Sequence, residues 1–302
     1  RNFVYKGKRK ILVSNRPSFN LITIPAKFRP KNGVKGAEAR KIARQRIYQT
    51  VVNLSKIVKL DVSETMKYLI TKNSFERVII KEDVKFDTIV KIASHQYMFP
   101  NIEWEDAPVR VYNHKNMFSH SIGYIGSINK KEYKRLKKIG YKHYQKIGKI
   151  GIEKQYDLSL RGKDGFIRRV VDVKNRIELE ELGKKPHGGN NIILTLDFDV
   201  QKAAYEAMGN VKGAVVVLKP ATGEIISLIS KPDFDPNTVI SKNNINVLKA
   251  LNSDKSNKPF LNRALQSKYP PASTFKLITA IAALETEKTH PNVKHHCPGK
   301  YT

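Results

Sequence analysis

The chain has 302 residues, which is room for about two domains. Apolar residues make up 40% of it and aromatic residues 9%, a composition that supports a buried core and excludes a disordered chain. Lys and Arg number 56 against 27 Asp and Glu, for a net charge of +29. Such an excess favours anionic partners, but the sequence has neither paired zinc-finger ligands nor an aromatic RNA-binding run. We therefore predict a solvated basic surface and no nucleic-acid binding.

The sequence shows no segment that would cross or enter a membrane. No stretch of 18 or more apolar residues occurs, and the chain neither begins with Met nor carries a signal peptide. The single cysteine, Cys297, excludes an intrachain disulfide. We expect an excised soluble part of a larger protein, with a membrane anchor preceding it.

The first hundred residues alternate between extended and helical patterns. Residues 1–30 are extended, with β-branched runs at 10–14 and 19–25. Apolar residues at helical spacing predict a helix over 37–59 and a short second helix after Asp61 or Ser63 as the cap. A strand is predicted over 75–80 and a third helix over 82–95. The three helices read as a small insertion between extended segments.

The next part of the chain is extended again up to a linker. Alternation predicts a strand at 108–112. A basic helix is predicted over 130–138, and after it the chain becomes extended again up to residue 173. Residues 183–189 contain three glycines and a proline and read as a linker. After it come a strand at 192–196, a helix at 199–208, and two strands, 211–218 and 224–230, joined by a tight turn that ends in Gly223.

The strongest chemical signal is the run YPPASTFK at 269–276, followed by the apolar run LITAIAALE. Two prolines deliver the chain into a helix whose first turn contains Ser273, and Lys276 is on the same face three residues later. A serine needs a base to become a good nucleophile, and a desolvated lysine can be that base. Because the helix is apolar almost all round, we expect it to be buried.

Two plainer interpretations compete with catalysis at this place. A serine before a helix is commonly an N-cap, and a lysine one turn later is commonly solvated. Ser-x-x-K alone occurs often by chance, so the four residues do not decide between these interpretations.

The flanking segments resemble the class B penicillin-binding proteins, most closely penicillin-binding protein 2, the elongation-type transpeptidase. The similarity lies in SIGYIGSINKKEY at 121–133, IGKIGIEKQYDLSLRGKDG at 147–165, IILTLDFDVQKAAYEAM at 192–208, GAVVVLKPATGEIISLISKPDFDPN at 213–237 and PFLNRALQSKYPPASTFK at 259–276. Order and spacing agree over most of the chain after about residue 100. The first hundred residues match more loosely.

The resemblance implies an α+β architecture in two parts. Residues 1–185 would form an extended non-catalytic pedestal, of the dimerisation type, with a helical head inserted at about 35–100. Residues 190–302 would form the first, incomplete part of an α/β transpeptidase domain.

The resemblance also implies a function, namely peptidoglycan D,D-transpeptidation through a serine acyl-enzyme. Ser273 would be acylated and Lys276 would be its general base. Peptidoglycan stem peptides would be substrates and β-lactam antibiotics inhibitors. The expected partners are a SEDS-family glycosyltransferase and a rod-shape scaffold protein. The parent protein would lie in the periplasm, held to the bacterial inner membrane by a single-pass anchor.

The alternative is that this chain is a non-catalytic pedestal fragment that docks cell-wall synthesis partners. The family also requires a Ser-x-Asn tripeptide and a Lys-Thr/Ser-Gly strand, and neither occurs at a matching position before Thr302. We therefore expect the chain alone neither to acylate efficiently nor to cross-link.

Residues after the nucleophile helix are candidate metal ligands. His290, His295, His296 and Cys297 are of types that bind zinc, and some related proteins hold a metal near this place. Adjacent His-His-Cys cannot all reach one tetrahedral ion, so we predict no metal and no other cofactor. The carboxylate pairs Glu180–Glu181 and Asp233/Asp235 are predicted to be solvated or to cap turns.

Overall fold

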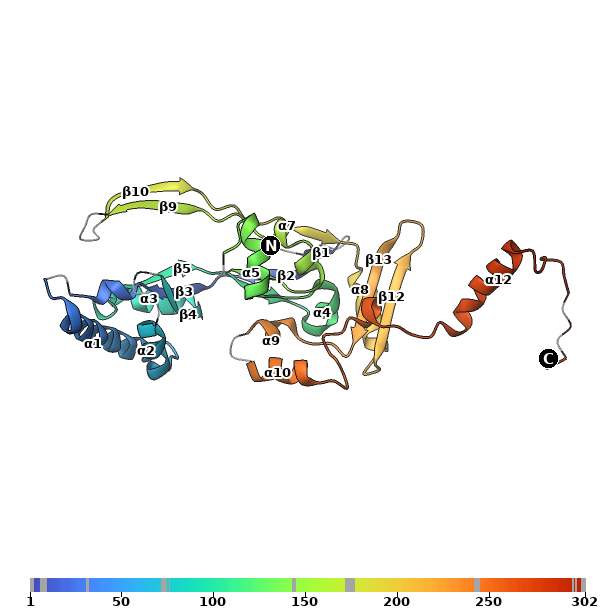
Figure 1. Cartoon of the computed structure of the whole chain (residues 1–302), viewed down its shortest axis with the longest axis horizontal. Helices are drawn as coiled ribbons and strands as arrows, with labels where there is room; N and C mark the ends of the chain where they lie inside the picture. The colour runs from blue at the N-terminus through green and yellow to red at the C-terminus, as the bar shows by residue number, and fades with distance from the viewer. Residues whose placement is uncertain are drawn as a thin grey trace.

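The computed structural model shows an elongated molecule with its helical head at one end and α12 at the other (Figure 1). The structure describes residues 3–5, 10–30, 33–71, 75, 77–142, 145–171, 177–241, 245–294, 296 and 298–299. Among these residues, no helix combines the length and the apolar character that a membrane crossing needs. The mixed helix and sheet content agrees with the predicted α+β class.

The head packs three helices on a three-stranded antiparallel sheet. The helices are α1 (Gly36–Ser55), α2 (Val62–Thr71) and α3 (Phe86–Ser94). The sheet has the order β4 (Val78–Val84), β3 (Phe19–Thr23) and β5 (Ile102–Asp106), and the turns η1 (Pro25–Phe28) and η2 (Gln96–Met98) join these elements. The predicted helical face of α1 is buried, including Ala43, Ile47, Val51 and Leu54, because this spacing puts them on one side of the helix.

Two boundaries in the head were predicted wrongly. The strand expected at 75–80 runs from Val78 to Val84, and the helix expected from residue 82 begins at Phe86. The reason is strand pairing, since Val84 is opposite Phe19 in the ladder between β3 and β4. A local pattern cannot reveal a partner strand sixty-odd residues away. The predicted cap is confirmed for Asp61, whose Oδ1 accepts the Glu64 N–H at 2.7 Å.

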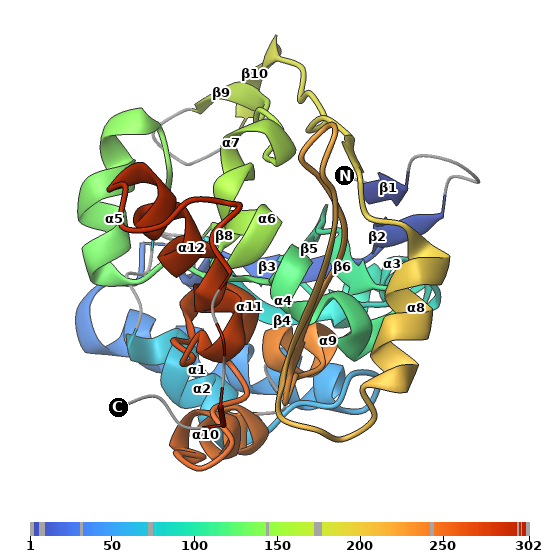
Figure 2. The same cartoon turned by 90° about the vertical axis from the view of Figure 1, so that its right-hand side faces the viewer.

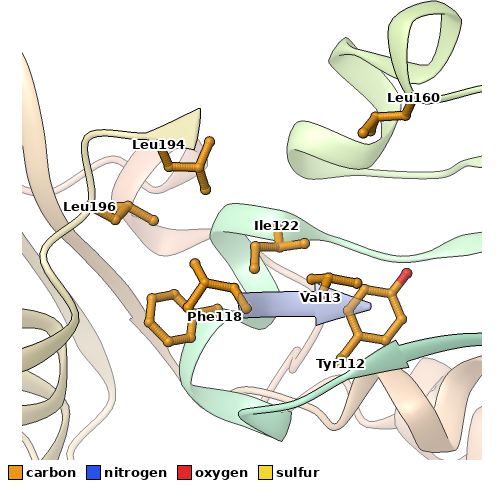
Figure 3. Close-up of a cluster of buried hydrophobic side chains, with 8 residues drawn as sticks. Val13, Tyr112, Phe118, Ile122, Leu160, Leu194 and Leu196 are labelled. Atoms are coloured by element: carbon orange, nitrogen blue, oxygen red, sulfur yellow. The ribbon is translucent and has the colours of Figure 1, made fainter. Parts of the chain in front are cut away.

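A four-stranded sheet joins distant parts of the chain in the region expected to be the pedestal, and one of its strands, β11, comes from beyond residue 185. Its order is β11 (Ile192–Leu194), β1 (Phe3–Tyr5), β2 (Ile11–Arg16) and β6 (Val109–Tyr112). β1 pairs with β11 in parallel and with β2 antiparallel. Side chains from this sheet and from the segments beside it form one core (Figure 3), made of Leu12, Val13, Tyr112, Phe118, Ile122, Leu160, Leu194 and Leu196.

Short elements surround this core. They are η3 (Lys115–Phe118), α4 (Ser119–Ile122), β7 (Ile125–Ser127), α5 (Lys130–Leu136), η4 (Lys137–Ile139), β8 (Lys146–Gly148), α6 (Gly151–Gln155) and α7 (Asp157–Leu160). The predicted basic helix is confirmed as α5. Asn129 and Glu132 start it with a reciprocal capping box, each side chain accepting the other's backbone N–H at 2.8 Å.

Two glycines let the backbones of α4 and α6 touch. A Cβ built on Gly151 would be 2.7 Å from the carbonyl carbon of Ile122 and 2.8 Å from the Gly123 nitrogen. Gly151 also has a φ of +63°, in the left-handed region that glycine tolerates best. This contact places α6 so that Glu153 lies under the pedestal sheet.

The remaining elements are a ribbon and a C-terminal third. The ribbon pairs β9 (Phe166–Val171) with β10 (Ile177–Lys184). The C-terminal third contains α8 (Phe198–Ala207), the hairpin β12 (Gly213–Lys219) and β13 (Glu224–Lys231), α9 (Pro236–Ile240), α10 (Ile245–Ser253), α11 (Arg263–Gln266), η6 (Ala272–Phe275) and α12 (Lys276–Glu285). The predicted hairpin is confirmed, and its turn ends in Gly223 with a φ of +70°.

Candidate functional site

Ser273 and Lys276 lie where one helical segment passes into the next. Ser273 is the second residue of η6, and Lys276 is the first residue of α12. The Lys276 backbone N–H donates to the Ser273 carbonyl oxygen, which closes one turn of 3-10 helix. The structure thus keeps the two residues one turn apart, as their spacing predicts.

The predicted burial of this helix is wrong for the part of the chain that the structure describes. Both Ser273 and Lys276 are exposed, and no residue of α12 is buried. Leu277 is 73% exposed and Ile281 60%. Figure 1 shows α12 standing clear of the other elements, and Figure 2 shows the same end of the molecule facing the viewer. The apolar surface of α12 predicts that another segment packs on the helix, but it does not specify which one. None of the described elements packs there.

The exposure removes the support that we expected for Lys276 as a base. Among the residues that the structure describes, none shields the Lys276 side chain from solvent. Neither Ser273 nor Lys276 forms a side-chain hydrogen bond or ion pair with another residue that the structure describes. The local geometry of Ser-x-x-K is present, and the described residues do not enclose it.

The segment before Ser273 is anchored on β13. The Arg263 backbone N–H donates to Ser230 Oγ at 2.8 Å, and that hydroxyl donates to the Leu261 carbonyl at 3.1 Å. The buried Arg263 guanidinium donates to the carbonyls of Asn257 and Lys258 at 2.5 and 3.3 Å. The start of α11 is therefore fixed to the hairpin. At Ser267 the chain leaves α11 in extended conformation.

Only two of the four candidate metal ligands lie within the residues that the structure describes. His290 and His296 are exposed, and His295 and Cys297 lie outside the described residues. Within the described part of the chain, no group of three or more His, Cys, Asp or Glu side chains has the proximity that a metal ion requires.

Sequence reasoning missed the polar junction between the pedestal and the C-terminal third. Its centre is Gln201 on α8, which is fully buried. The Gln201 amide donates to the carbonyls of Met117 and Leu228 at 2.9 and 3.0 Å. Its oxygen accepts from Ser227 Oγ at 2.8 Å and from the Leu228 N–H at 2.9 Å. Both the donors and the acceptor of the Gln201 amide have hydrogen-bond partners. The side chain therefore joins α8 to β13 and to η3 and leaves none of its own buried polar atoms unsatisfied.

A second amide, Asn237, joins α9 to the edge of the pedestal sheet. Its oxygen accepts the Tyr112 N–H and its nitrogen donates to the Tyr112 carbonyl, both at 2.9 Å. The side chain thereby pairs with β6 as a neighbouring strand would. Asp235 caps α9 by accepting the Asn237 N–H at 2.8 Å, which confirms its predicted capping role.

Asp233 does more than the predicted turn role. It accepts from Asn116 at 2.8 Å and from the Tyr205 hydroxyl at 2.7 Å. Burial raises the pKa of Tyr205, and the hydrogen bond to Asp233 raises it further. Tyr205 therefore stays a donor across the neutral range. The signal in the sequence was the motif PDFDPN, whose polar residues we interpreted only as local turn chemistry.

His120 lies in the same junction. Its ring packs edge-to-face on Phe234, with centroids 5.3 Å apart, and its Nε2 is 3.3 Å from the Pro232 carbonyl oxygen. Burial lowers the pKa of His120, and the charge of Arg263 acts in the same direction, while the Pro232 carbonyl and Asp233 oppose them. The imidazole is therefore held neutral between the two parts of the chain.

Comparisons with known proteins agree with this arrangement. The profile of the Penicillin-binding Protein dimerisation domain matches residues 1–194, and that of the Penicillin binding protein transpeptidase domain matches residues 213–302. The peptidoglycan D,D-transpeptidase MrdA of Acinetobacter baumannii is 33% identical over 288 residues, covering 94% of this chain and 40% of the relative. The chain thus spans less than half of that relative's length.

Solved structures show the same fold. Penicillin-binding protein 2 of Helicobacter pylori, in a complex with MreC, has a TM-score of 0.75 at 23% identity, covering 97% of this chain and 52% of that one. A peptidoglycan synthase complex described as coordinating polymerization and crosslinking gives a TM-score of 0.61 at 26% identity, covering 98% and 48%. The dimerisation profile covers more than half of the chain and the transpeptidase profile follows it directly. The chain belongs to the class B penicillin-binding proteins.

Proposed function

We propose that the protein containing this chain is a peptidoglycan D,D-transpeptidase of cell-wall elongation, with Ser273 as nucleophile and Lys276 as general base. The observation that carries the proposal is the position of these two residues. They are one turn apart where η6 passes into α12, inside the range that the transpeptidase profile matches. We further propose the predicted division into a pedestal at 1–185, with its head at about 35–100, and the first part of a transpeptidase domain at 190–302.

The reaction has two halves. Ser273 Oγ attacks the carbonyl carbon of the penultimate D-Ala of a stem peptide, and Lys276 Nζ accepts the hydroxyl proton. The amide C–N bond breaks, the proton passes to the leaving nitrogen, and D-Ala departs from a serine ester. An amine of a neighbouring stem peptide then attacks the ester carbonyl. The new amide forms, and Ser273 leaves with a proton restored to its oxygen.

The proposal includes the setting of the enzyme. β-Lactams would acylate Ser273 in place of the dipeptide. The parent protein would be anchored in the bacterial inner membrane with these residues in the periplasm. A SEDS-family glycosyltransferase and a rod-shape scaffold protein would bind it. The partner proposal draws support from two similar structures, one described as a complex with MreC and one as a peptidoglycan synthase complex.

A second function is favoured for this chain taken alone. Among the described residues, apolar clusters are buried in the pedestal and its head, whereas Ser273 and Lys276 are exposed and no described element covers α12. We propose that the 302-residue chain acts as a docking pedestal and acylates poorly, because no described residue packs around Ser273 and Lys276.

Labelling with a fluorescent penicillin tests both proposals. In the full-length protein, Ser273→Ala should abolish covalent labelling, and Lys276→Gln should slow it by about 100-fold or more, the usual contribution of a general base. Ser267→Ala removes a hydroxyl from the same segment and serves as the matched control, since it should label at the wild-type rate. The isolated 302-residue chain should label at most slowly.

Each arm has a distinct contrary result. Labelling that survives Ser273→Ala would mean that another residue is the nucleophile. Rapid, stoichiometric labelling of the isolated chain would contradict the docking role as its main function while leaving the assignment of Ser273 intact.

A further inference from the structure

A groove on the pedestal has an apolar lining and a cationic rim. It has a volume of about 480 Å³ and lies between α5–η4 on one side and α6–α7 on the other. Figure 1 shows α5 in the middle of the molecule's length, far from α12. The lining of the groove includes Lys131, Arg135, Leu136, Ile139, Lys154 and Leu158.

The apolar part of the groove faces solvent. Ile139 is 55% exposed and Leu158 68%, and Leu136, which also lines the groove, is half-buried. Tyr141 and Ile147 line the groove as well, and both are buried. Leu136 and Ile139 are three residues apart, one turn along α5 and η4, so they present one continuous ridge. Large apolar side chains gathered in a concave surface are typical of a binding site for a partner.

The two carboxylates that line the groove are already occupied. Glu132 accepts a hydrogen bond from the Lys149 ammonium at 2.6 Å, and it also accepts the Asn129 N–H in the capping box of α5. Asp157 accepts the Gly148 N–H at 2.9 Å and a short hydrogen bond from the Tyr141 hydroxyl. Burial and this bond raise the pKa of Tyr141 to about 12, so the hydroxyl stays a donor at neutral pH.

The cations that line the groove, in contrast, are less fully matched, although Arg135 lies near enough to Glu132 to interact with its charge. Lys131, Arg135 and Lys154 are exposed, and none of them forms an ion pair with a carboxylate among the residues that the structure describes. The groove therefore offers positive charge around an apolar strip. Its complement is a surface with an apolar stripe bordered by negative charge.

We propose that this groove binds an amphipathic helix of a protein partner, with Leu- or Ile-type residues on one face and Asp or Glu beside them. A helix presents apolar residues at i, i+3, i+4 and i+7, which matches a ridge-lined groove, and its flanking carboxylates would meet Lys131, Arg135 and Lys154. A membrane surface fits less well, because it is flat while the apolar residues here line a concavity between two helical segments. The site is separate from Ser273 and does not depend on acyl transfer.

The test uses a fluorescent peptide of about 15 residues, stapled as a helix, with leucines at the i, i+3, i+4, i+7 positions and glutamates elsewhere. Fluorescence anisotropy measures its binding to the full-length protein, with a scrambled peptide of equal composition as the ligand control. We expect binding of the helical peptide that weakens as salt rises. Lys131→Glu with Arg135→Glu, and separately Ile139→Ser with Leu158→Ser, should each weaken it by about tenfold or more.

The matched protein control is Lys134→Glu with Lys138→Glu. It makes the same charge change on the same helical segment at positions that do not line the groove, so it should bind as wild type does. Circular dichroism melts check that each variant is folded, and Lys154→Glu alone gives a second, milder charge variant. A lysine-substituted peptide should regain affinity for the Lys131→Glu/Arg135→Glu protein.

Three results would overturn the inference. They are equal binding of the scrambled peptide, equal weakening by the control variant, and groove variants that lose binding to vesicles of anionic phospholipid while their peptide affinity is unchanged. The last outcome would assign the groove to a lipid surface instead. Penicillin labelling of the groove variants should be unchanged, so this test fails or succeeds independently of the role of Ser273.

Discussion

Arg110 and Glu153 are an ion pair removed almost completely from water. Arg110 Nε donates to Glu153 Oε1 at 2.7 Å, and the two side chains are 2% and 1% exposed. The guanidinium also donates to Asn15 at 3.3 Å, and the Tyr112 hydroxyl donates to Glu153 at 3.3 Å. Such a pair contributes little net stability compared with apolar residues, but each charge depends on the other, because an unpaired charge in this place is poorly solvated.

A charge-removing variant tests this dependence. Glu153→Gln should lower the free energy of unfolding of the pedestal by about 3 kcal/mol or more, because Arg110 is left charged and buried. The double variant Arg110→Met/Glu153→Leu should recover most of that loss. Urea denaturation measures both.

The control for this prediction is an exposed pair. Lys202 and Glu206 are 3.8 Å apart on α8, with side chains 52% and 65% exposed. Glu206→Gln should change the stability by about 0.5 kcal/mol or less. A double variant as unstable as Glu153→Gln would show that the pair itself is needed.

At the scale of elements, the backbone contact between α4 and α6 determines where Glu153 lies. α6 has only five residues and cannot be stable through helix propensity alone. Its position depends on Gly151, whose missing Cβ lets the chain approach Ile122 and Gly123.

Gly151→Ala should therefore destabilise the pedestal by about 3 kcal/mol or more, since a left-handed alanine is strained and its methyl group meets backbone atoms that cannot move aside. Gly223→Ala is the matched control, because its φ of +70° imposes the same conformational strain while a Cβ there meets nothing within 4 Å. It should cost only about 1–2 kcal/mol. Thermal and urea unfolding of both variants measure the difference. Equal losses would mean that the close approach is not the cause.

Elements with a periodic pattern of their own were predictable from the sequence. α1, α5, α8 and the hairpin β12–β13 all appear within a few residues of the predicted bounds, because their apolar spacing and turn residues are local. The position of Ser273 and Lys276 one turn apart was also local. The burial of α12 was not predictable, because it depends on which segment packs against the helix. The boundary between β4 and α3 was not predictable either, because it depends on a partner strand.

Across the molecule as a whole, the pedestal and the C-terminal third are joined by polar side chains as well as by aromatic contacts, such as those of Phe118 with Phe198 and of Tyr124 with Phe234. Gln201 and Asn237 satisfy backbone groups of the other part, and His120 lies between them with a lowered pKa. No local pattern distinguishes these residues from ordinary helix and turn residues, because their partners in the pedestal, Met117 for Gln201 and Tyr112 for Asn237, are more than 80 positions away. This is why sequence reasoning overlooked the junction.

The lowered pKa of His120 predicts that the protein becomes less stable as the pH falls. Its folded pKa is below its ordinary value of 6.5, so the unfolded chain binds the proton first as the pH falls. The stability linked to this group is fully present above about pH 6.5 and decreases as the pH falls through 6.5 toward the lower folded value. The Tm of the wild-type chain should therefore fall more between pH 8 and pH 5 than that of His120→Gln, measured by scanning calorimetry. Parallel falls in the two proteins would show that His120 does not carry this dependence.

The pairing of β1 with β11 also determines when the pedestal can become complete. Phe3 is opposite Ile192, so the sheet edge formed by the first strand stays unpaired until the segment after the β9–β10 ribbon has emerged from the ribosome. The head contains only shorter-range pairings, since β3 needs no residue beyond β5. During synthesis the head can therefore fold first. Until β11 is made, the pedestal sheet keeps an unpaired strand edge, and such edges promote aggregation.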